Sequence, residues 1–232
     1  MRPRRELVVY EVIAALAIAA VWGVADPGVP VIVPLVIVAT ASRYARGGSW
    51  SELMRGGGAH VRIGALAGLA ALALALVAGT PVVEAVTDRA VVWSQYPIVR
   101  GSLQQTLGVA IVVAAAAAAT ELALRGWIVD RVCAPPFGGA ARSGEAGPGD
   151  RICELQARPS RVMPVMIGAI AEAALAQGSV ATRLGAAVFG AGLSWMFVAS
   201  PGTGGRSLTA PITARVAFQL GALTLEGLRW IG

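Results

Sequence analysis

Residues 103–129 read LQQTLGVAIVVAAAAAATELALRGWIV, and this stretch decides the fold class. From 107 to 119 it consists of Gly and aliphatic residues, and as a helix it is long enough to cross a bilayer. A charge near the bilayer centre costs roughly 2.5–3.5 kcal/mol, so Glu121 and Arg125 need a specific reason to be there. They are four residues apart with the acid first, which is the better order for an ion pair on one helix face. The stretch therefore predicts a transmembrane helix that carries a buried ion pair.

Further apolar runs lie on both sides of this stretch. Apolar residues make up 56% of the 232 residues and charged residues only 14%, whereas soluble domains have about 25% charged residues. We therefore predict an all-α, polytopic helical membrane protein with one transmembrane domain over residues 1–232 and six or seven transmembrane spans. The further runs are residues 7–25, 29–42, 63–86, 162–177, 184–200 and 207–228.

Two features within these runs affect helix shape and packing. Pro30 and Pro34 lie in the short second run, which is either kinked or extends through Tyr44. Gly64 and Gly68 give the third run a small-residue spacing that permits close helix approach, and packing within the chain is the more common use of such a spacing.

The positive charge of the chain is carried entirely by arginine. Its 19 basic residues exceed the 13 acidic ones, and most of them lie between apolar runs. Arginines so placed indicate membrane orientation rather than nucleic acid binding. We expect location in the cell membrane, with the N-terminus, the segments 43–62 and 201–206, and a flexible loop at about 130–161 all cytoplasmic.

Polar groups also interrupt the later apolar runs. Glu172 lies in the fifth run, and Arg215 and Gln219 lie four residues apart on one face of the last. In a structural interpretation, these groups neutralise the predicted ion pair and fasten three helices together. Glu11, in the first run, either pairs with this cluster or faces the membrane interface.

The sequence around Glu121 resembles the first motif of the CPBP family, the intramembrane glutamic proteases that include CAAX proteases and bacteriocin-processing proteins, also called the Abi family. That motif reads Glu-Glu-x-x-x-Arg and is commonly followed by Gly. Thr120 stands at its first Glu position, Glu121 at the second, Arg125 at the Arg and Gly126 at the Gly.

The segment 204–222, GGRSLTAPITARVAFQLGA, resembles the last motif of this family. There a Gly-Ser-Leu-x-x-Pro-like lead precedes His-x-x-x-Asn or His-x-x-x-Asp. Arg215 stands where the motif has His, and Gln219 where it has Asn or Asp.

The family's middle motif, Phe-x-x-x-His, has two candidate registers, and neither contains a histidine. One pairs Glu172 with Ala176, and the other pairs Phe189 with Leu193. The single histidine of the chain, His60, lies in an Arg-rich segment and is interpreted as a solvated loop residue.

The resemblance implies an intramembrane endopeptidase in which the first motif Glu activates water, histidines hold the catalytic group, and an Asn stabilises the oxyanion. This chain has Thr120 at the position of that base, and it lacks both motif histidines. A guanidinium at position 215 close to Glu121 would hold that carboxylate as a counter-ion. Whether the chain is an enzyme is therefore left open.

Three functions stay open at this point. The favoured one is a non-catalytic or strongly impaired CPBP-like relative, a pseudoenzyme that acts as a scaffold or regulator of membrane proteins. A second is an active glutamic endopeptidase with Glu121 as base and Arg215 as oxyanion donor. A third is a polar intramembrane pocket for an anionic lipid or solute. The expected partners are the lipid bilayer and another membrane protein or peptide; no cofactor or metal is expected, and the oligomeric state stays open.

Overall fold

The computed structural model describes residues 11, 13, 14, 17, 18, 21, 30–88, 103–133, 162–176, 179–199 and 206–229, and all regular structure within them is helical. This confirms the all-α prediction for the described part of the chain. Most of the first predicted run, and the predicted loop from residue 134 onward, lie outside it. The predicted loop at about 130–161 is wrong at its start, because residues Asp130–Cys133 continue the preceding helix.

The helices follow the predicted apolar runs closely. Two of them are unbroken stretches of several segments: α3 continues through a π-helical segment η2 into α4, and α5 continues through a second π-helical segment η3 into α6. The elements are α2 (Ile32–Ala45), the 3₁₀ turn η1 (Trp50–Glu52), α3 (Gly58–Leu74), η2 (Ala75–Gly79), α4 (Thr80–Thr87), α5 (Leu103–Ala123), η3 (Leu124–Val129), α6 (Asp130–Cys133), α8 (Val162–Leu175), α9 (Val180–Val198) and α10 (Thr209–Arg229).

Local chemistry explains several helix ends. Pro34 lies in the first turn of α2, where a missing N–H costs nothing, so this proline does not interrupt the helix. The helix then extends past Tyr44 to Ala45. The Ser179 hydroxyl caps α9 by accepting a hydrogen bond from the Thr182 amide at 3.2 Å. At the C-terminal end of α4, Asp88 has a positive φ of 51° and ends the helix.

The π-helical segment η2 ends at Gly79, two residues before Pro81. Proline has no amide hydrogen and its ring crowds the preceding turn, so a regular α-helix cannot continue through it unchanged. The wider π turn accommodates the ring, and the Thr80 hydroxyl donates to the Ala75 carbonyl at 3.1 Å. The helix Gly58–Thr87 thus remains continuous.

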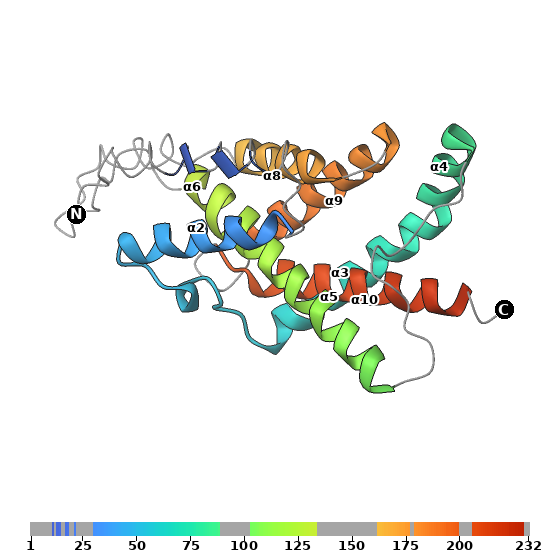
Figure 1. The fold of residues 1–232 in the computed structure, drawn as a ribbon, viewed down its shortest axis with the longest axis horizontal. Helices are drawn as coiled ribbons and strands as arrows, with labels where there is room; N and C mark the ends of the chain where they lie inside the picture. Colours follow the sequence, from blue (N-terminus) through green and yellow to red (C-terminus); the bar gives the residue numbers. More distant parts are fainter. Residues whose placement is uncertain are drawn as a thin grey trace, which may run out of the picture.

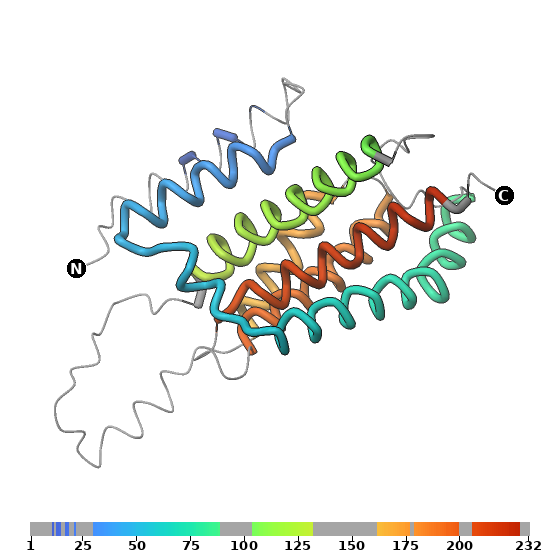
Figure 2. Tube along the Cα trace, turned by 90° about the horizontal axis from the view of Figure 1, so that it is seen from below, coloured from blue at the N-terminus to red at the C-terminus, as the bar shows by residue number. Residues whose placement is uncertain are grey.

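The helices form a layer with a second pair behind it. Figure 2 shows α2, α5, α10 and α3 side by side in that order, with α8 and α9 packed against one another on one side of the layer. Figure 1 shows α4 leading away from the end of α3, while α10 runs close to both α3 and α5. This arrangement places α5 and α10 at the centre of the molecule.

The contact between α3 and α10 depends on small residues. A methyl group added at Gly64 would overlap the Ala210 carbonyl oxygen, and one added at Gly68 would overlap that of Ala214. The predicted role of these glycines in packing within the chain is therefore confirmed. Close backbone approach of this kind is a usual way for apolar helices to associate.

Three helices among the described residues are long and apolar enough to cross a membrane: Gly58–Thr87, Gln104–Val129 and Val180–Val198. Two shorter helices, Ile32–Ala45 and Val162–Leu175, are also apolar. Large aliphatic side chains lie exposed on the outer helix faces, where lipid rather than water would suit them. Examples are Leu66, Val77, Ile111, Ile170 and Val188.

Candidate functional site: a buried ring of four charges

The predicted ion pair of α5 is present and fully buried. Arg125 Nη1 lies 3.1 Å from Glu121 Oε1, and both side chains are 0% exposed. Arg125 belongs to the π-helical segment η3, a kind of distortion that is frequent at functional sites. The spacing of four residues in the sequence thus predicted the pair.

Two further helices bring their charges to this pair. Glu172 of α8 accepts from Arg125 Nη1 at 2.7 Å, and Arg215 of α10 donates from Nη2 to Glu172 Oε2 at 2.5 Å. The Nε atom of Arg215 also donates to Glu121 Oε1. Glu172 and Arg215 are 8% and 6% exposed.

These contacts close a ring in which negative and positive groups alternate. Each carboxylate uses one oxygen to accept from both guanidiniums, and each guanidinium donates to both carboxylates. The charge ring (Glu121, Arg125, Glu172 and Arg215) is formally neutral, because two acids balance two bases. Neutrality and mutual hydrogen bonding are what make buried charges tolerable in an apolar bundle.

Helix α9 supplies acceptors that the sequence did not reveal. Arg125 donates from Nε to the Ser194 hydroxyl at 3.3 Å and from Nη2 to the Gly190 carbonyl at 2.9 Å. A single serine in an apolar helix is the only sequence signal for the first contact, and a backbone carbonyl gives none. With these two bonds, Arg125 is hydrogen-bonded through all three of its nitrogens.

Small residues allow α8 and α9 to approach the ring. A methyl group at Gly190 would lie 2.6 Å from Glu172 Cβ, and one at Gly168 would overlap the Ser194 hydroxyl. The Arg215 guanidinium lies 5.5 Å from the centre of the Phe189 ring, in cation–π range. One register of the predicted middle motif thus places Glu172 in the ring, and the other places Phe189 beside it.

Two predicted site residues lie outside the network of ring contacts. The Thr120 hydroxyl donates to the Ala116 carbonyl of its own helix at 2.8 Å. Gln219 shares a helix face with Arg215, but its buried Oε1 has no hydrogen-bond partner in the described part of the chain. Glu121 Oε2 is likewise buried without a partner among the described residues.

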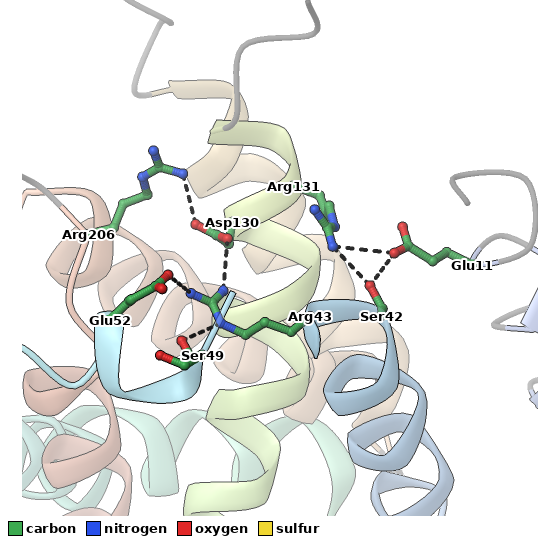
Figure 3. A network of polar contacts seen from close by, with 8 residues as sticks. All are labelled: Glu11, Ser42, Arg43, Ser49, Glu52, Asp130, Arg131 and Arg206. Atoms are coloured by element: carbon green, nitrogen blue, oxygen red, sulfur yellow. Dashed lines mark hydrogen bonds and ion pairs between the residues drawn. The ribbon is translucent and has the colours of Figure 1, made fainter. Parts of the chain in front are cut away.

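Glu11 does not join the charge ring, so that alternative is wrong. Its carboxylate accepts from the Ser42 hydroxyl, lies 3.3 Å from Arg131 Nη2, and lies 2.5 Å from Arg46 Nη2. Figure 3 shows Glu11, Ser42 and Arg131 together, apart from a second group of charges. Arg46 and Arg131, which lie at helix ends outside the charge ring, pair with this acid instead.

The second group joins three chain segments at the same end of the bundle. Asp130 lies 3.4 Å from Arg43 and 2.8 Å from Arg206, and Arg43 also pairs with Glu52 at 3.3 Å (Figure 3). We call this end, formed by residues 43–57, 130–133 and 206–208, the polar end. Of the segments predicted to share one side of the membrane, the described residues 43–57, 130–133 and 206 lie at this one end.

The 3₁₀ turn η1 packs against α2 at the polar end. Trp50 of η1 donates from Nε1 to the Thr40 hydroxyl at 3.3 Å, and Arg43 lies 5.3 Å from the centre of its ring. The Leu53 carbonyl accepts from the Leu208 amide at 2.7 Å. These contacts tie the α2–α3 connection to the start of α10.

Within the described residues, no group of three or more His, Cys, Asp or Glu side chains could hold a metal ion. The arrangement is suited to binding helices together through charge, and one of its buried carboxylate oxygens, Glu121 Oε2, has no donor among the residues that the structure describes. No family model, curated protein or solved structure matches the chain.

Proposed function

We propose that this protein is a non-catalytic membrane scaffold or regulator, a pseudoenzyme-like relative of the CPBP family that acts by contacting another membrane protein or peptide. The observation that carries the proposal is the closed charge ring, in which both carboxylates are held between two guanidiniums. We further propose six or seven spans in the cell membrane, with the N-terminus, the polar end and the loop after residue 133 on the cytoplasmic side. Arginines gathered at the polar end support this orientation.

The contacts of the ring argue against a general base. A base must accept a proton from water within hydrogen-bond reach, and its strength falls when fixed cations hold its charge. Glu121 Oε1 already accepts from both ring arginines. The Thr120 hydroxyl, which stands at the family's base position, is engaged with its own helix.

One observation favours the active endopeptidase as a second candidate. Glu121 Oε2 is buried and has no hydrogen-bond partner among the described residues, so it could accept from a water molecule that enters the site. In that case Arg215, which replaces the motif histidine, would donate to the oxyanion. The third function, an anionic lipid or solute in the ring, is disfavoured because the two acids already neutralise the two arginines.

The test is proteolysis of a set of membrane-protein substrates, prenylated and unprenylated, by the full chain in proteoliposomes. Wild type, Glu121→Gln and Thr120→Glu are compared after each has been shown to elute as a monodisperse species. The scaffold proposal expects no cleavage by wild type above the Glu121→Gln background. Cleavage that is present in wild type and lost in Glu121→Gln would overturn it in favour of the endopeptidase.

The Thr120→Glu variant is a matched gain-of-function control. It restores the residue type that the family motif has at this position, while the ring residues are unchanged. If the substrates suit the fold, this variant is the one expected to show weak cleavage. Cleavage by Thr120→Glu with a silent wild type would support a scaffold whose base has been lost.

A further inference from the structure

The chain that joins α2 to α3 lies against the segment that carries Arg125. We call residues 46–57 the strap, and its 3₁₀ turn η1 carries the half-buried Trp50. A methyl group added at Gly126 would lie 2.6 Å from Trp50 Cζ3, so the indole lies directly against the backbone of η3. Gly126 follows Arg125 in the chain. The strap therefore contacts η3 at the residue next to a member of the charge ring.

Trp50 also packs along the rest of η3. It lies against two core clusters, one of which contains Val129 and the other Trp127, and both of these residues belong to η3. Its Nε1 atom donates to the Thr40 hydroxyl of α2, which orients the indole. A single side chain thus holds η3 from the side of the strap.

The strap is fastened by charges at the polar end. Arg43 donates from Nε to the Ser49 carbonyl at 2.7 Å and pairs with Glu52 of η1 at 3.3 Å (Figure 3). The same guanidinium lies 3.4 Å from Asp130, which continues the helix beyond η3. The Glu52 side chain is 47% exposed, so groups outside the protein can compete for this fastening.

The π-helical form of η3 gives the strap an element to act on. A π segment contains one residue more than the regular α-helix that it interrupts. Its loss would therefore turn the side chains on its two sides relative to one another by about 100°. From within η3, Arg125 reaches Glu172 of α8 and Ser194 of α9. The place of Arg125 in the charge ring thus depends on the register of η3.

We propose that the strap is a conformational device in which Trp50 holds η3 in its π register and so keeps Arg125 in the charge ring. Because the strap and the ring favour the same register, loosening either one loosens the other. A group that draws Arg43 away from Asp130 weakens the hold on Arg125. The device is built from contacts within the chain and does not depend on whether the protein is a scaffold or an endopeptidase.

The experiment is hydrogen exchange of side-chain N–H groups, followed by NMR on the full chain in lipid nanodiscs with labelled arginine and tryptophan. The Nε–H of Arg125 is buried against Ser194, so it exchanges when Arg125 leaves the ring. Trp50→Ala should raise its exchange rate about tenfold or more, because a well-packed aromatic contact is lost. The Nε–H of Arg215, on α10, should rise by a smaller factor. No rise at Arg125, or equal rises at Arg125 and Arg215, would overturn the proposal.

A matched pair of glycine variants on one continuous helix tests the contact itself. Gly126→Ala places a methyl group against the Trp50 indole and should raise the Arg125 exchange rate, whereas Gly108→Ala, where no atom lies within 4 Å of the new methyl group, should leave it unchanged. Equal rates in the two variants would contradict the seating of the indole on η3. Arg43→Gln unfastens the strap at the polar end and should also raise the Arg125 rate. A rate equal to that of wild type would overturn the coupling to the polar end.

The reciprocal measurement follows the strap while the ring is changed. Glu172→Gln removes an acid partner of Arg125 and should raise the exchange rate of the Trp50 Nε1–H, which Trp50→Phe identifies in the spectrum. An unchanged indole rate in Glu172→Gln would overturn the coupling. The cleavage assay measures a different property, so failure of the strap and failure of the scaffold proposal are distinguishable.

Discussion

Replacing Arg215 with glutamine removes one corner of the charge ring, and its cost can be worked from the contacts. Arg215 donates charge-assisted hydrogen bonds to Glu121 and, at 2.5 Å, to Glu172. Such bonds contribute about 1.5–3 kcal/mol each. The variant also leaves two buried carboxylates with Arg125 as their only cation in the ring. We expect Arg215→Gln to lower the free energy of unfolding by about 3–5 kcal/mol, as breaking a buried ion pair does.

A second substitution should recover much of this loss. Glu172→Gln added to Arg215→Gln removes one charge of each sign and leaves the neutral pair of Glu121 and Arg125 at 3.1 Å. The double variant should therefore cost less than the sum of the two single variants by about 2 kcal/mol or more. The exchange Glu172→Arg with Arg215→Glu should not rescue, because each new side chain would meet a like charge at Arg125 or Glu121.

The assay is reversible unfolding in mixed micelles, followed by circular dichroism as the denaturing detergent fraction rises. Wild type, both single variants, the double variant and the exchange are compared in one lipid and detergent mixture. Additive costs in the double variant, or a cost below about 1 kcal/mol for Arg215→Gln, would refute the idea of a coupled ring. Rescue by the exchange would indicate an isolated pair between positions 172 and 215.

Two further predictions concern the small residues that let the helices approach. Gly168→Ala should destabilise by about 1–3 kcal/mol, because the new methyl group overlaps the Ser194 hydroxyl, whereas Gly192→Ala in open space should stabilise by about 0.5–1 kcal/mol; equal effects in the same unfolding assay would contradict the packing of α8 on α9. Gly68→Ala should also destabilise by at least about 1 kcal/mol, because its methyl group meets the backbone carbonyl of Ala214, which cannot move without separating α3 from α10; a thermal unfolding midpoint equal to that of wild type would show that the two helices are not in close contact.

The helix bounds could be predicted from the sequence because long apolar runs interrupted by Gly, Pro and Arg leave few alternatives. The bounds of α9 and α10 differ from the predicted runs by only a few residues. The loop predicted to start at 130 omits the short α6, because a charged residue after an apolar run suggests that the helix has ended. In the structure the helix continues, and Asp130 pairs with Arg43 and Arg206 across the polar end. A long-range ion pair of that kind has no signature in local composition.

Parts of the charge ring were predictable for different reasons. Glu121 and Arg125 follow from helical spacing, whereas Arg215 stands out both as a charge in an apolar run and by the motif resemblance. Ser194 and the Gly190 carbonyl were missed, because one serine in an apolar run is common and a carbonyl is present in every residue. The sequence does not decide the partners of Glu11, because they depend on which helix end lies beside the first run.

The closed charge ring is tested most directly by solid-state NMR distance measurements on the full chain in lipid bilayers, with labelled arginine and glutamate side chains. The measurement compares the guanidinium of Arg215 with the carboxylates of Glu121 and Glu172. The ring predicts that both carboxylates lie within about 4 Å of the Arg215 nitrogens, and that both contacts vanish in Arg215→Gln. An Arg215 guanidinium that contacts neither carboxylate in the bilayer would contradict the ring, and with it the proposal that Glu121 is held as a counter-ion.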